Sequence, residues 1–379
     1  MANTEHPSPL RALRVTENAS PERSRKTNRT LLLQALIQHG PLSRADLARQ
    51  SSLSKPLVSD LVGELLDKGV IEQIGTRRRT SAGKPATMLA VRDDSFQIIA
   101  LDLSDEKRFT GVVTNLRGKV LHRAEGAVAG RAGEAALDLV ADLLGRLIQL
   151  STAPLLGVGI GTPGIVESKR VVRLASSLRW ENVDLAAGVR GDYEGAIHVA
   201  NDANAAVLGM YAYRGAERSS LLLVTLEHGI GAGLIIGGSL VEGPQFAAGE
   251  IGHIVVDDDG DRCSCGLRGC LDLAASAPNL RLRLERDPSD RDRILSDAAL
   301  ALGRALTPMI ALTGVKDVVI AGPVDLVSDH FLRAVEETIV QRSIPAVNAG
   351  LRVVSAPGGE DLVLLGAAAM VLSAELGVT

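Results

Sequence analysis

The segment GEIGHIVVDDDGDRCSCGLRGCLD, residues 249–272, contains all 3 cysteines of the 379-residue chain. One imidazole, that of His253, precedes the thiols of Cys263, Cys265 and Cys270. Three cysteines are an odd number for a disulfide framework, but with one histidine they form a complete tetrahedral ligand set for zinc. A set with no open position indicates a structural zinc site rather than a hydrolytic one. The alternative is a chance cluster of free buried cysteines, which the glycines of this loop make less attractive.

A carboxylate and an imidazole stand together at the start of the same segment. Glu250 and His253 are three positions apart, so a zinc ion on His253 would help to hold both side chains at one site. A carboxylate suits a sugar because it accepts hydrogen bonds from two hydroxyls at once. By itself an E-x-x-H pair is a weak signal and is more often part of an ordinary polar surface.

The sequence around this segment alternates between short buried strands and helices. Strands are predicted over 97–103 and 155–160, with a helix over 132–150 between them, and the second strand runs into the glycine turn GTPG at 161–164. The theme repeats where a strand ends on NDAN at 201–204 and an alanine-rich helix follows. Two similar lobes with a ligand cleft between them are therefore expected.

The N-terminal part has a different organisation. Residues 1–25 are rich in proline, serine and charge, which predicts a disordered arm. Helices are predicted over 27–40, over 43–50 with Ser43 as N-cap, and after Ser54, and two strands follow them. This order predicts a winged helix-turn-helix over residues 26–92.

The charge distribution favours nucleic acid as the partner of this N-terminal part. Residues 1–92 hold 15 Lys/Arg against 8 Asp/Glu, whereas the remainder holds 26 against 37. The third helix of such a domain enters the major groove, and basic residues of the wing gain most beside phosphates. A solvated basic loop is the alternative. The expected DNA contacts are Arg44, Ser54, Lys55, Pro56, Ser59, Arg77, Arg78, Arg79 and Lys84.

Three motifs together resemble the landmarks of one family. The run at 249–272, GTPG at 161–164 and NDANAAVLG at 201–209 are similar, in order and spacing, to those of the ROK family of bacterial sugar kinases and sugar-responsive repressors. The resemblance covers about residues 96–379, and the winged helix resembles that of the repressor branch. It implies an α/β, two-lobed actin-like or ribonuclease H-like fold with a structural zinc loop. The lobes would be approximately 96–200 plus the C-terminal helix, and 201–362.

The resemblance also implies a sugar bound between the lobes. Asp272 stands where the family usually has glutamate, and Ser176 or Ser177 stands where it often has asparagine or threonine, which leaves the identity of the sugar open. His253 would serve both zinc and ligand. Carried over position by position, the ligand contacts are Gly164, Ser176, Asn201, Asp202, Glu250, His253 and Asp272.

The loops that hold ATP in the family's kinases are altered here. D-x-G-G-T is replaced by DLSDEK at 102–107, G-T-G-I-G-G by EHGIGA at 227–232, and a Gly-Gly pair by Gly322-Pro323. Side chains and carboxylates thus occupy positions where backbone N–H groups should approach a polyanion. Asp202 matches the base of the kinases and would be catalytic only if kinase activity persists. These departures predict a sensor rather than an enzyme.

The sequence therefore predicts a sugar-responsive, DNA-binding transcriptional regulator, foremost a repressor. The absence of a signal peptide and of a long apolar run predicts a cytoplasmic protein without a membrane segment. A homodimer or homotetramer on palindromic double-stranded DNA is expected, because one such module buries too little surface to be selective. Two alternatives stay open: an active ROK sugar kinase with a DNA-binding head, and a DNA-bound regulator that responds to a protein partner.

Overall fold

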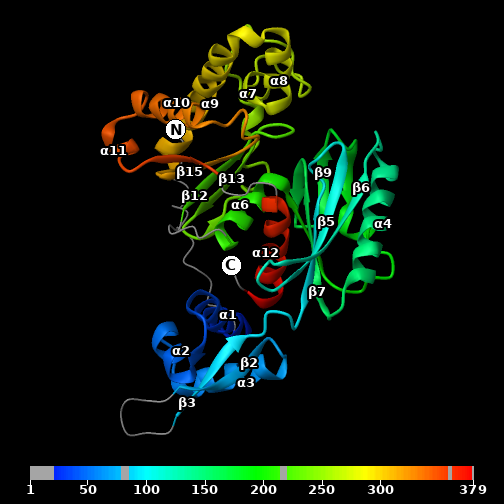
Figure 1. Ribbon diagram of the computed structural model, residues 1–379, viewed down its shortest axis with the longest axis vertical. Coiled ribbons are helices and arrows are strands. Elements are labelled where there is room, and N and C mark those ends of the chain that lie inside the picture. The colour runs from blue at the N-terminus through cyan, green and yellow to red at the C-terminus, as the bar shows by residue number, and fades with distance from the viewer. Residues whose placement is uncertain (1–20, 78–84, 214–219, 357–360, 378–379) are drawn as a thin grey trace, which may run out of the picture. The chain divides into compact units, whose positions relative to one another are not determined.

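The computed structural model describes residues 21–77, 85–213, 220–356 and 361–377, and it divides the chain into the units Met1–Val91 and Arg92–Thr379. In the first unit, helices pack beside a sheet with the strand order β1-β3-β2 (Figure 1). The elements of this unit are α1 (Pro21–His39), β1 (Leu42–Ser43), α2 (Arg44–Ser51), α3 (Lys55–Asp67), β2 (Ile71–Arg77) and β3 (Ala86–Val91).

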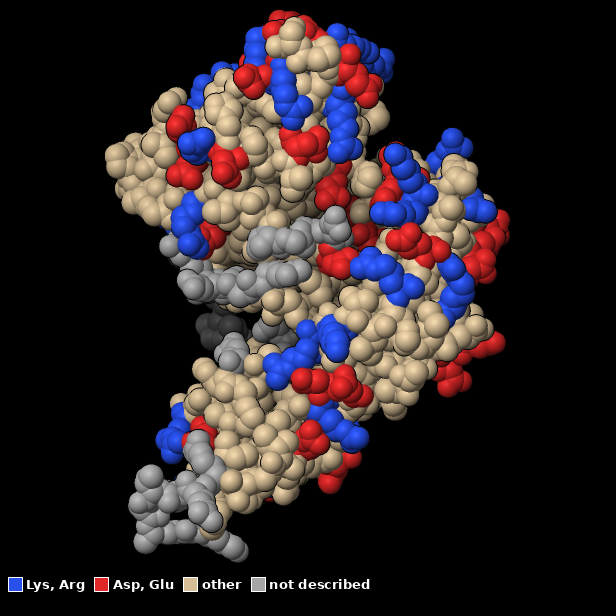
Figure 2. All heavy atoms as spheres, in the orientation of Figure 1, with Lys and Arg blue, Asp and Glu red and all other residues tan. Residues whose placement is uncertain are grey.

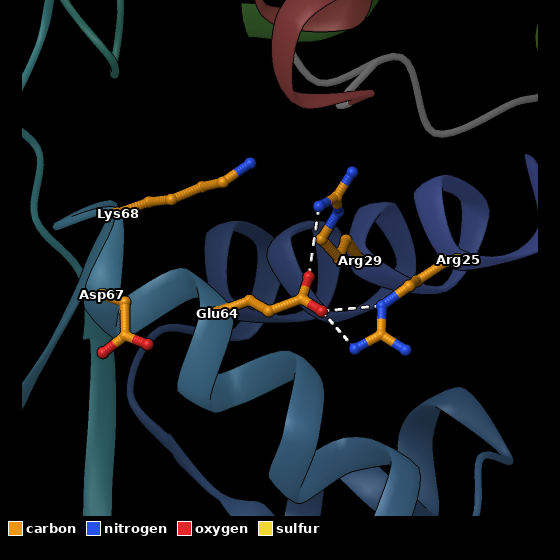
Figure 3. A pocket seen from close by; sticks show the side chains of 5 residues that line it. All are labelled: Arg25, Arg29, Glu64, Asp67 and Lys68. Carbon is orange, nitrogen blue, oxygen red and sulfur yellow. Dashed lines mark hydrogen bonds and ion pairs between the residues drawn. The ribbon is translucent and has the colours of Figure 1, made fainter. Parts of the chain in front are cut away.

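Helix α1 includes residues 21–25, which corrects the expectation that a disordered arm extends to residue 25. A contact distant in sequence holds this part of the helix: Glu64 of α3 accepts hydrogen bonds from Arg25 and Arg29 (Figure 3). The bonds from Arg25, followed by the charges of both guanidinium groups, lower the pKa of Glu64 despite its partial loss of hydration. Residues 1–20 lie outside the described part of the chain.

Helices α2 and α3 form as their end signals predict. Ser43 Oγ accepts from Asp46 N at 3.2 Å while Asp46 Oδ2 accepts from Ser43 N at 3.1 Å, which confirms the predicted cap and completes a capping box. At the end of α3, Gly69 adopts a positive φ of 68°, and its N–H donates to Leu66 O at 2.9 Å. The buried stripe of α3 consists of Val58, Leu61, Val62 and Leu65.

The wing is the antiparallel pair of β2 and β3, in register from Ile71 opposite Val91 to Arg77 opposite Ala86. A bulge at Gln73 and Gly75 interrupts the pairing. The two strands confirm the predicted hairpin. Its tip, with Arg78, Arg79 and Lys84, lies outside the described residues.

The second unit contains a five-stranded sheet in the order β11-β7-β4-β5-β6, with α4 on one face and α12 on the other (Figure 1). Strand β7 shows why both helices fit. Val158 and Ile160 join the core beneath α4, whereas Gly159, between them, lets α12 approach so closely that a Cβ there would lie 2.1 Å from Ala367 O. The elements are β4 (Gln97–Asp102), β5 (Arg108–Asn115), β6 (Val120–Ala127), α4 (Glu134–Leu150), β7 (Leu155–Thr162), β11 (Ile197–Asn201) and α12 (Leu362–Leu376).

A second five-stranded sheet repeats this topology in the order β14-β13-β12-β15-β16. When the strands of each sheet are numbered along the chain, both sheets read 3-2-1-4-5. Helices α9 and α10 cover one face, and α6 lies against the other. This is the two-lobed arrangement that the repeated sequence theme predicts. The elements are α6 (Asp202–Tyr213), β12 (Leu221–Thr225), β13 (Gly231–Ile236), β14 (Ser239–Leu240), α9 (Arg291–Thr313), β15 (Asp317–Ala321), α10 (Asp329–Gln341) and β16 (Arg352–Ser355).

Helices α6 and α12 lie side by side between the two sheets (Figure 1). Their backbones approach closely at two points: a Cβ on Gly366 would lie 1.6 Å from Ala205 O, and one on Gly209 would lie 2.3 Å from Leu362 O. Only glycine fits either position, so the alanine- and glycine-rich sequences of both helices follow from this crossing.

One helical segment of this unit has the length and composition of a membrane span. This segment is Pro288–Thr313, but 50% of its most apolar window is buried within the fold. It is therefore accounted for as a core helix of the second sheet. The remaining elements are β8 (Ile165–Glu167), β9 (Val171–Ala175), β10 (Trp180–Asp184), α5 (Leu185–Gly188), η1 (Ile251–His253), α7 (Leu271–Ala275), α8 (Ala277–Arg286), η2 (Pro288–Asp290) and α11 (Pro345–Asn348).

Candidate ligand and metal sites

The Cys/His cluster is assembled by a tight hairpin. Cys263 N donates to Leu267 O at 2.8 Å, and the chain turns through Gly266, whose φ is 95°. An isolated bridge between Val255 and Cys270 returns the third cysteine to the end of η1, where His253 lies. The sequence thus places its four candidate ligands together because glycine allows the turn that their spacing requires.

The ligand atoms fit one small cation. All four lie within 4.8 Å of one another. Cys263 Sγ is 3.7 Å from His253 Nδ1, and Cys265 Sγ is 3.6 Å from Cys270 Sγ. Two zinc–sulfur bonds of about 2.3 Å at a tetrahedral centre place their sulfurs roughly 3.8 Å apart. Burial and the neighbouring thiols raise the pKa of Cys270, so an added cation is what would allow these sulfurs to be thiolates together.

Three carboxylates from different elements form a second cluster. Asp202 begins α6, Asp102 ends β4, and Glu250 precedes η1. Burial, together with the negative charges of Asp102 and Glu250, raises the pKa of Asp202 to about 7. Burial also raises the pKa of Asp102, although hydrogen bonds from Ser104 oppose the shift. The structure therefore brings Asp202 and Glu250 together as the sequence led us to expect, and adds Asp102 to them.

The charge of Glu250 also interacts with the metal-ligand cluster. Loss of hydration raises the pKa of the Glu250 carboxyl, and His253 beside it lowers that pKa. Because Nδ1 of His253 faces Cys263, its other ring nitrogen is not used by the cluster. One imidazole can thus face the thiols with one nitrogen and a ligand with the other.

Asn201 and Gly164 are adjacent, but part of their hydrogen-bonding capacity is used internally. Asn201 Nδ2 donates to Gly164 O at 3.0 Å, and Asn201 Oδ1 accepts from Asn204 N at 3.1 Å. Gly164 has a φ of 91°, and a Cβ there would lie 2.0 Å from Leu174 O. Asn201 therefore ties the GTPG turn to the start of α6, and it keeps one amide hydrogen for a ligand.

Asp272 likewise has a structural bond. Its Oδ1 accepts from Ile230 N at 2.9 Å, and burial raises its pKa. This bond joins the first turn of α7 to the loop before β13. One carboxylate oxygen remains for a ligand.

Ser176 lies exposed in the turn between β9 and β10, where its carbonyl accepts from Arg179 N at 3.2 Å. The two residues before it pack against Gly164, where a Cβ would lie 2.0 Å from Leu174 O and 2.8 Å from Ala175 Cα. The turn of Ser176 therefore lies beside the GTPG turn.

The expected DNA contacts gather on two parts of the first unit. Ser54, Lys55, Pro56 and Ser59 are exposed at the N-terminal end of α3. Arg44 begins α2 and is half-buried, and Arg77 ends β2. The described residues therefore present one end of α3 for a groove.

Comparisons with known proteins identify the second unit. The model of the "ROK family" matches residues 98–374, and that of "Winged helix-turn-helix DNA-binding" matches residues 25–72. The chain belongs to the ROK family. These two matches confirm the expected pairing of a winged helix-turn-helix with a ROK domain, which is the domain composition of a DNA-binding regulator.

Relatives with and without the N-terminal domain are found. The chain is 29% identical to the xylose repressor of Bacillus subtilis over 69% of its own length and 68% of that protein. It is 28% identical to the glucokinase of Thermotoga maritima, which is matched over 97% of its length but covers only 73% of this chain. A crystal structure of a ROK family transcriptional regulator, a homologue of Escherichia coli Mlc, shares the fold with a TM-score of 0.82 at 22% identity, covering 94% of this chain and 98% of that one.

In the loops of the ROK domain that differ from the kinase motifs, side chains accept hydrogen bonds from backbone N–H groups. Asp102 Oδ1 accepts from Ser104 N at 2.9 Å and from Ser104 Oγ at 2.7 Å, and Asp105 Oδ1 accepts from Lys107 N at 2.7 Å. Ile230 N is taken by Asp272. Backbone donors at these positions are thus occupied by carboxylates rather than left open to a phosphate.

Proposed function

We propose that this protein is a sugar-responsive transcriptional repressor whose ROK domain senses its ligand without phosphorylating it. The carrying observation is the carboxylate cluster of Asp102, Asp202 and Glu250 beside the Cys/His cluster, in a chain that also has a DNA-binding domain. Relatives named xylose repressor support a sugar as the ligand.

The ligand site would use the oxygens and nitrogens that internal bonds leave available. Glu250 and Asp202 would accept hydrogen bonds from sugar hydroxyls, and the second ring nitrogen of His253 would complete the contact on the metal-ligand side. Asn201 would contribute its second amide hydrogen, and Asp272 would contribute its second carboxylate oxygen. Gly164 would allow close approach of the backbone. Ser176 would take part from the turn that follows Ala175, which packs against Gly164.

Zinc would be the structural metal of the ROK domain, held by His253, Cys263, Cys265 and Cys270. Zinc would tie η1 to the hairpin through these four ligands and fix the ring of His253, while the protein itself would supply the contacts to the ligand. The domains would be 26–92 for the winged helix and 96–379 for the ROK domain, with lobes of 96–200 plus the C-terminal helix and 201–362.

DNA binding would place the exposed end of α3 in the major groove of a palindromic double-stranded site. Lys55, Ser59 and Pro56 would meet base edges, whereas arginines of the wing would supply affinity that depends on salt. The protein would act in the cytoplasm as a homodimer or homotetramer. Further contacts would come from Arg44, Ser54, Arg77, Arg78, Arg79 and Lys84. On the ROK domain, Figure 2 shows basic and acidic side chains interspersed over the visible face, as expected of a part that does not bind DNA.

The test measures binding to DNA that the protein selects from a random-sequence pool, by fluorescence anisotropy, with and without xylose, glucose and N-acetylglucosamine. One sugar should change the DNA affinity at least tenfold, and Glu250→Ala should remove that response while leaving DNA binding intact. Glu181→Ala, an exposed glutamate on β10, is the matched control. An unchanged sugar response in Glu250→Ala would reject the proposed ligand site.

A kinase remains the second candidate because Asp202 occupies the first position of α6 with a pKa near neutrality, which suits a general base. It requires sugar-dependent ATP turnover that Asp202→Asn abolishes. We expect no turnover with the same sugars, because the phosphate loops are occupied by side chains. Measurable turnover would overturn the sensor assignment and favour this candidate.

A further inference from the structure

The three thiols of the metal-ligand cluster differ sharply in accessibility. Cys263 and Cys270 are 5% and 0% exposed, whereas Cys265 is exposed to solvent at the tip of the hairpin. A cysteine sulfur binds zinc as the thiolate, because the metal replaces its proton. Cys265 therefore offers a nucleophilic sulfur where a small oxidant in water can reach it.

Two arginines belong to the same hairpin as this sulfur. Arg262 and Arg268 pair across the hairpin in an isolated antiparallel bridge, and both are exposed. Cys265 lies between them in the chain, within the loop that this bridge closes. Two cationic residues in one short loop favour reaction with a peroxide, because negative charge develops on the departing oxygen.

A second thiol lies ready to complete the reaction. Cys270 Sγ is 3.6 Å from Cys265 Sγ, while Cys263 Sγ is engaged with His253 Nδ1 at 3.7 Å. Cys270 is fully buried, so it is protected from direct attack but can reach its exposed neighbour. The cluster thus contains one accessible sulfur and one shielded sulfur in contact.

We propose that Cys265 is an oxidation site for hydroperoxides, and that its disulfide with Cys270 releases zinc and disables the ligand site; this rests on the proposed zinc site. The Cys265 sulfur attacks one oxygen of hydrogen peroxide, the O–O bond breaks, and the departing hydroxide takes a proton to become water. The Cys270 thiolate then attacks the Cys265 sulfenic acid, the S–S bond forms as the S–O bond breaks, and the departing hydroxide takes a proton from solvent to become a second water. Two electrons pass from the two sulfurs to the peroxide.

The structure connects this event to the ligand site along two short segments. His253 would lose the metal that orients its ring. His253 is the last residue of η1, and Glu250 directly precedes the same short helix. Cys270 directly precedes α7, whose Asp272 bonds to Ile230 N. Oxidation would therefore loosen the ligand residues on both sides of the cluster.

The test uses the zinc-loaded full-length protein treated with hydrogen peroxide. Zinc release is followed with a chromogenic chelator, the disulfide is located by peptide mass mapping without reduction, and stability is followed by thermal unfolding. We expect about one zinc released per chain, a Cys265–Cys270 disulfide and a lower Tm, all reversed by reductant plus zinc.

Variants that keep every metal ligand test the role of the arginines. Arg262→Gln and Arg268→Gln should each slow zinc release by roughly two- to fivefold, as expected for one exposed charge at short range. Arg304→Gln, an exposed arginine on α9, should leave the rate unchanged and serves as control. Equal rates in all variants would overturn the role assigned to the hairpin.

Zinc content is measured first, because it separates the two proposals. Protein that purifies and refolds without zinc would reject the zinc site and this inference with it. Protein that keeps its zinc in excess peroxide, or that forms a disulfide other than Cys265–Cys270, would overturn the inference and leave the proposed function standing.

Discussion

Replacing Asp202 with asparagine should stabilise the protein at pH 8, and this advantage should shrink as the pH falls. Asp202 is buried at the start of α6, and burial with the charges of Asp102 and Glu250 raises its pKa to about 7 from the ordinary 3.8. A carboxylate that the fold holds at a raised pKa is destabilising when charged. Asparagine has nearly the same shape and cannot carry the charge.

The sign and size follow from proton linkage. Above pH 7 Asp202 is charged in both the folded and unfolded states, so the wild type bears the full cost. Between 7 and 3.8 the folded state binds a proton that the unfolded state does not, and stability rises as the pH falls. For these two values the wild type gains about 3 kcal/mol between pH 8 and pH 5, and asparagine gains nothing from this position.

Urea unfolding followed by the fluorescence of Trp180 measures this difference. Trp180 is the 1 tryptophan of the chain and is 2% exposed in the ROK domain, so it reports unfolding of the relevant unit. The stability advantage of Asp202→Asn should fall by about 3 kcal/mol from pH 8 to pH 5. Asp138→Asn, an exposed carboxyl on α4, should show no such change. A constant advantage of Asp202→Asn across this range would refute the argument from buried charge.

Three further predictions concern stability. Gly366→Ala should lower the free energy of unfolding by more than ~3 kcal/mol, because its Cβ would lie 1.6 Å from Ala205 O. Gly145→Ala on α4, where a Cβ would have nothing within 4 Å, should raise it by up to ~1 kcal/mol. Urea unfolding compares the two variants, and similar values would contradict the close crossing of α6 and α12. Ser43→Ala should cost about 1 kcal/mol by removing the cap of α2, seen as faster hydrogen exchange in that helix, and unchanged exchange would argue against the capping box. Chelation of zinc should lower the Tm of the ROK domain, with Cys270→Ala matching the chelated protein; a Tm indifferent to zinc would reject a structural metal.

Features set by neighbouring residues could be predicted from the sequence. Ser43 and Asp46 form the capping box as their spacing indicates, and the Cys/His set meets because its glycines permit one tight hairpin. The repeated order of strands and helices predicted two lobes, since each strand signal lies within a few residues. These predictions needed no knowledge of distant contacts.

Features that depend on distant contacts could not be predicted. The helical part of residues 21–25 contacts Glu64, which is 39 positions from Arg25. Asp102 joins Asp202 only because β4 and β11 flank the same strand, so a pattern within one segment could not reveal the pair. Asn201 and Asp272 were expected as ligand contacts, but no local signal shows that each already has an internal bond.

The crossing of α6 and α12 has a mechanical consequence. Because Ala205 and Gly366 bring backbone against backbone, no side chain stands between the two helices at this point when one lobe turns relative to the other. The crossing can therefore act as a pivot. The lobes can rotate about it at small energetic cost, but they cannot separate without losing the contact between α6 and α12. A ligand that contacts both lobes would then fix the angle between the lobes rather than the distance between them. The free energy of binding would favour one rotational position of the lobes over the others.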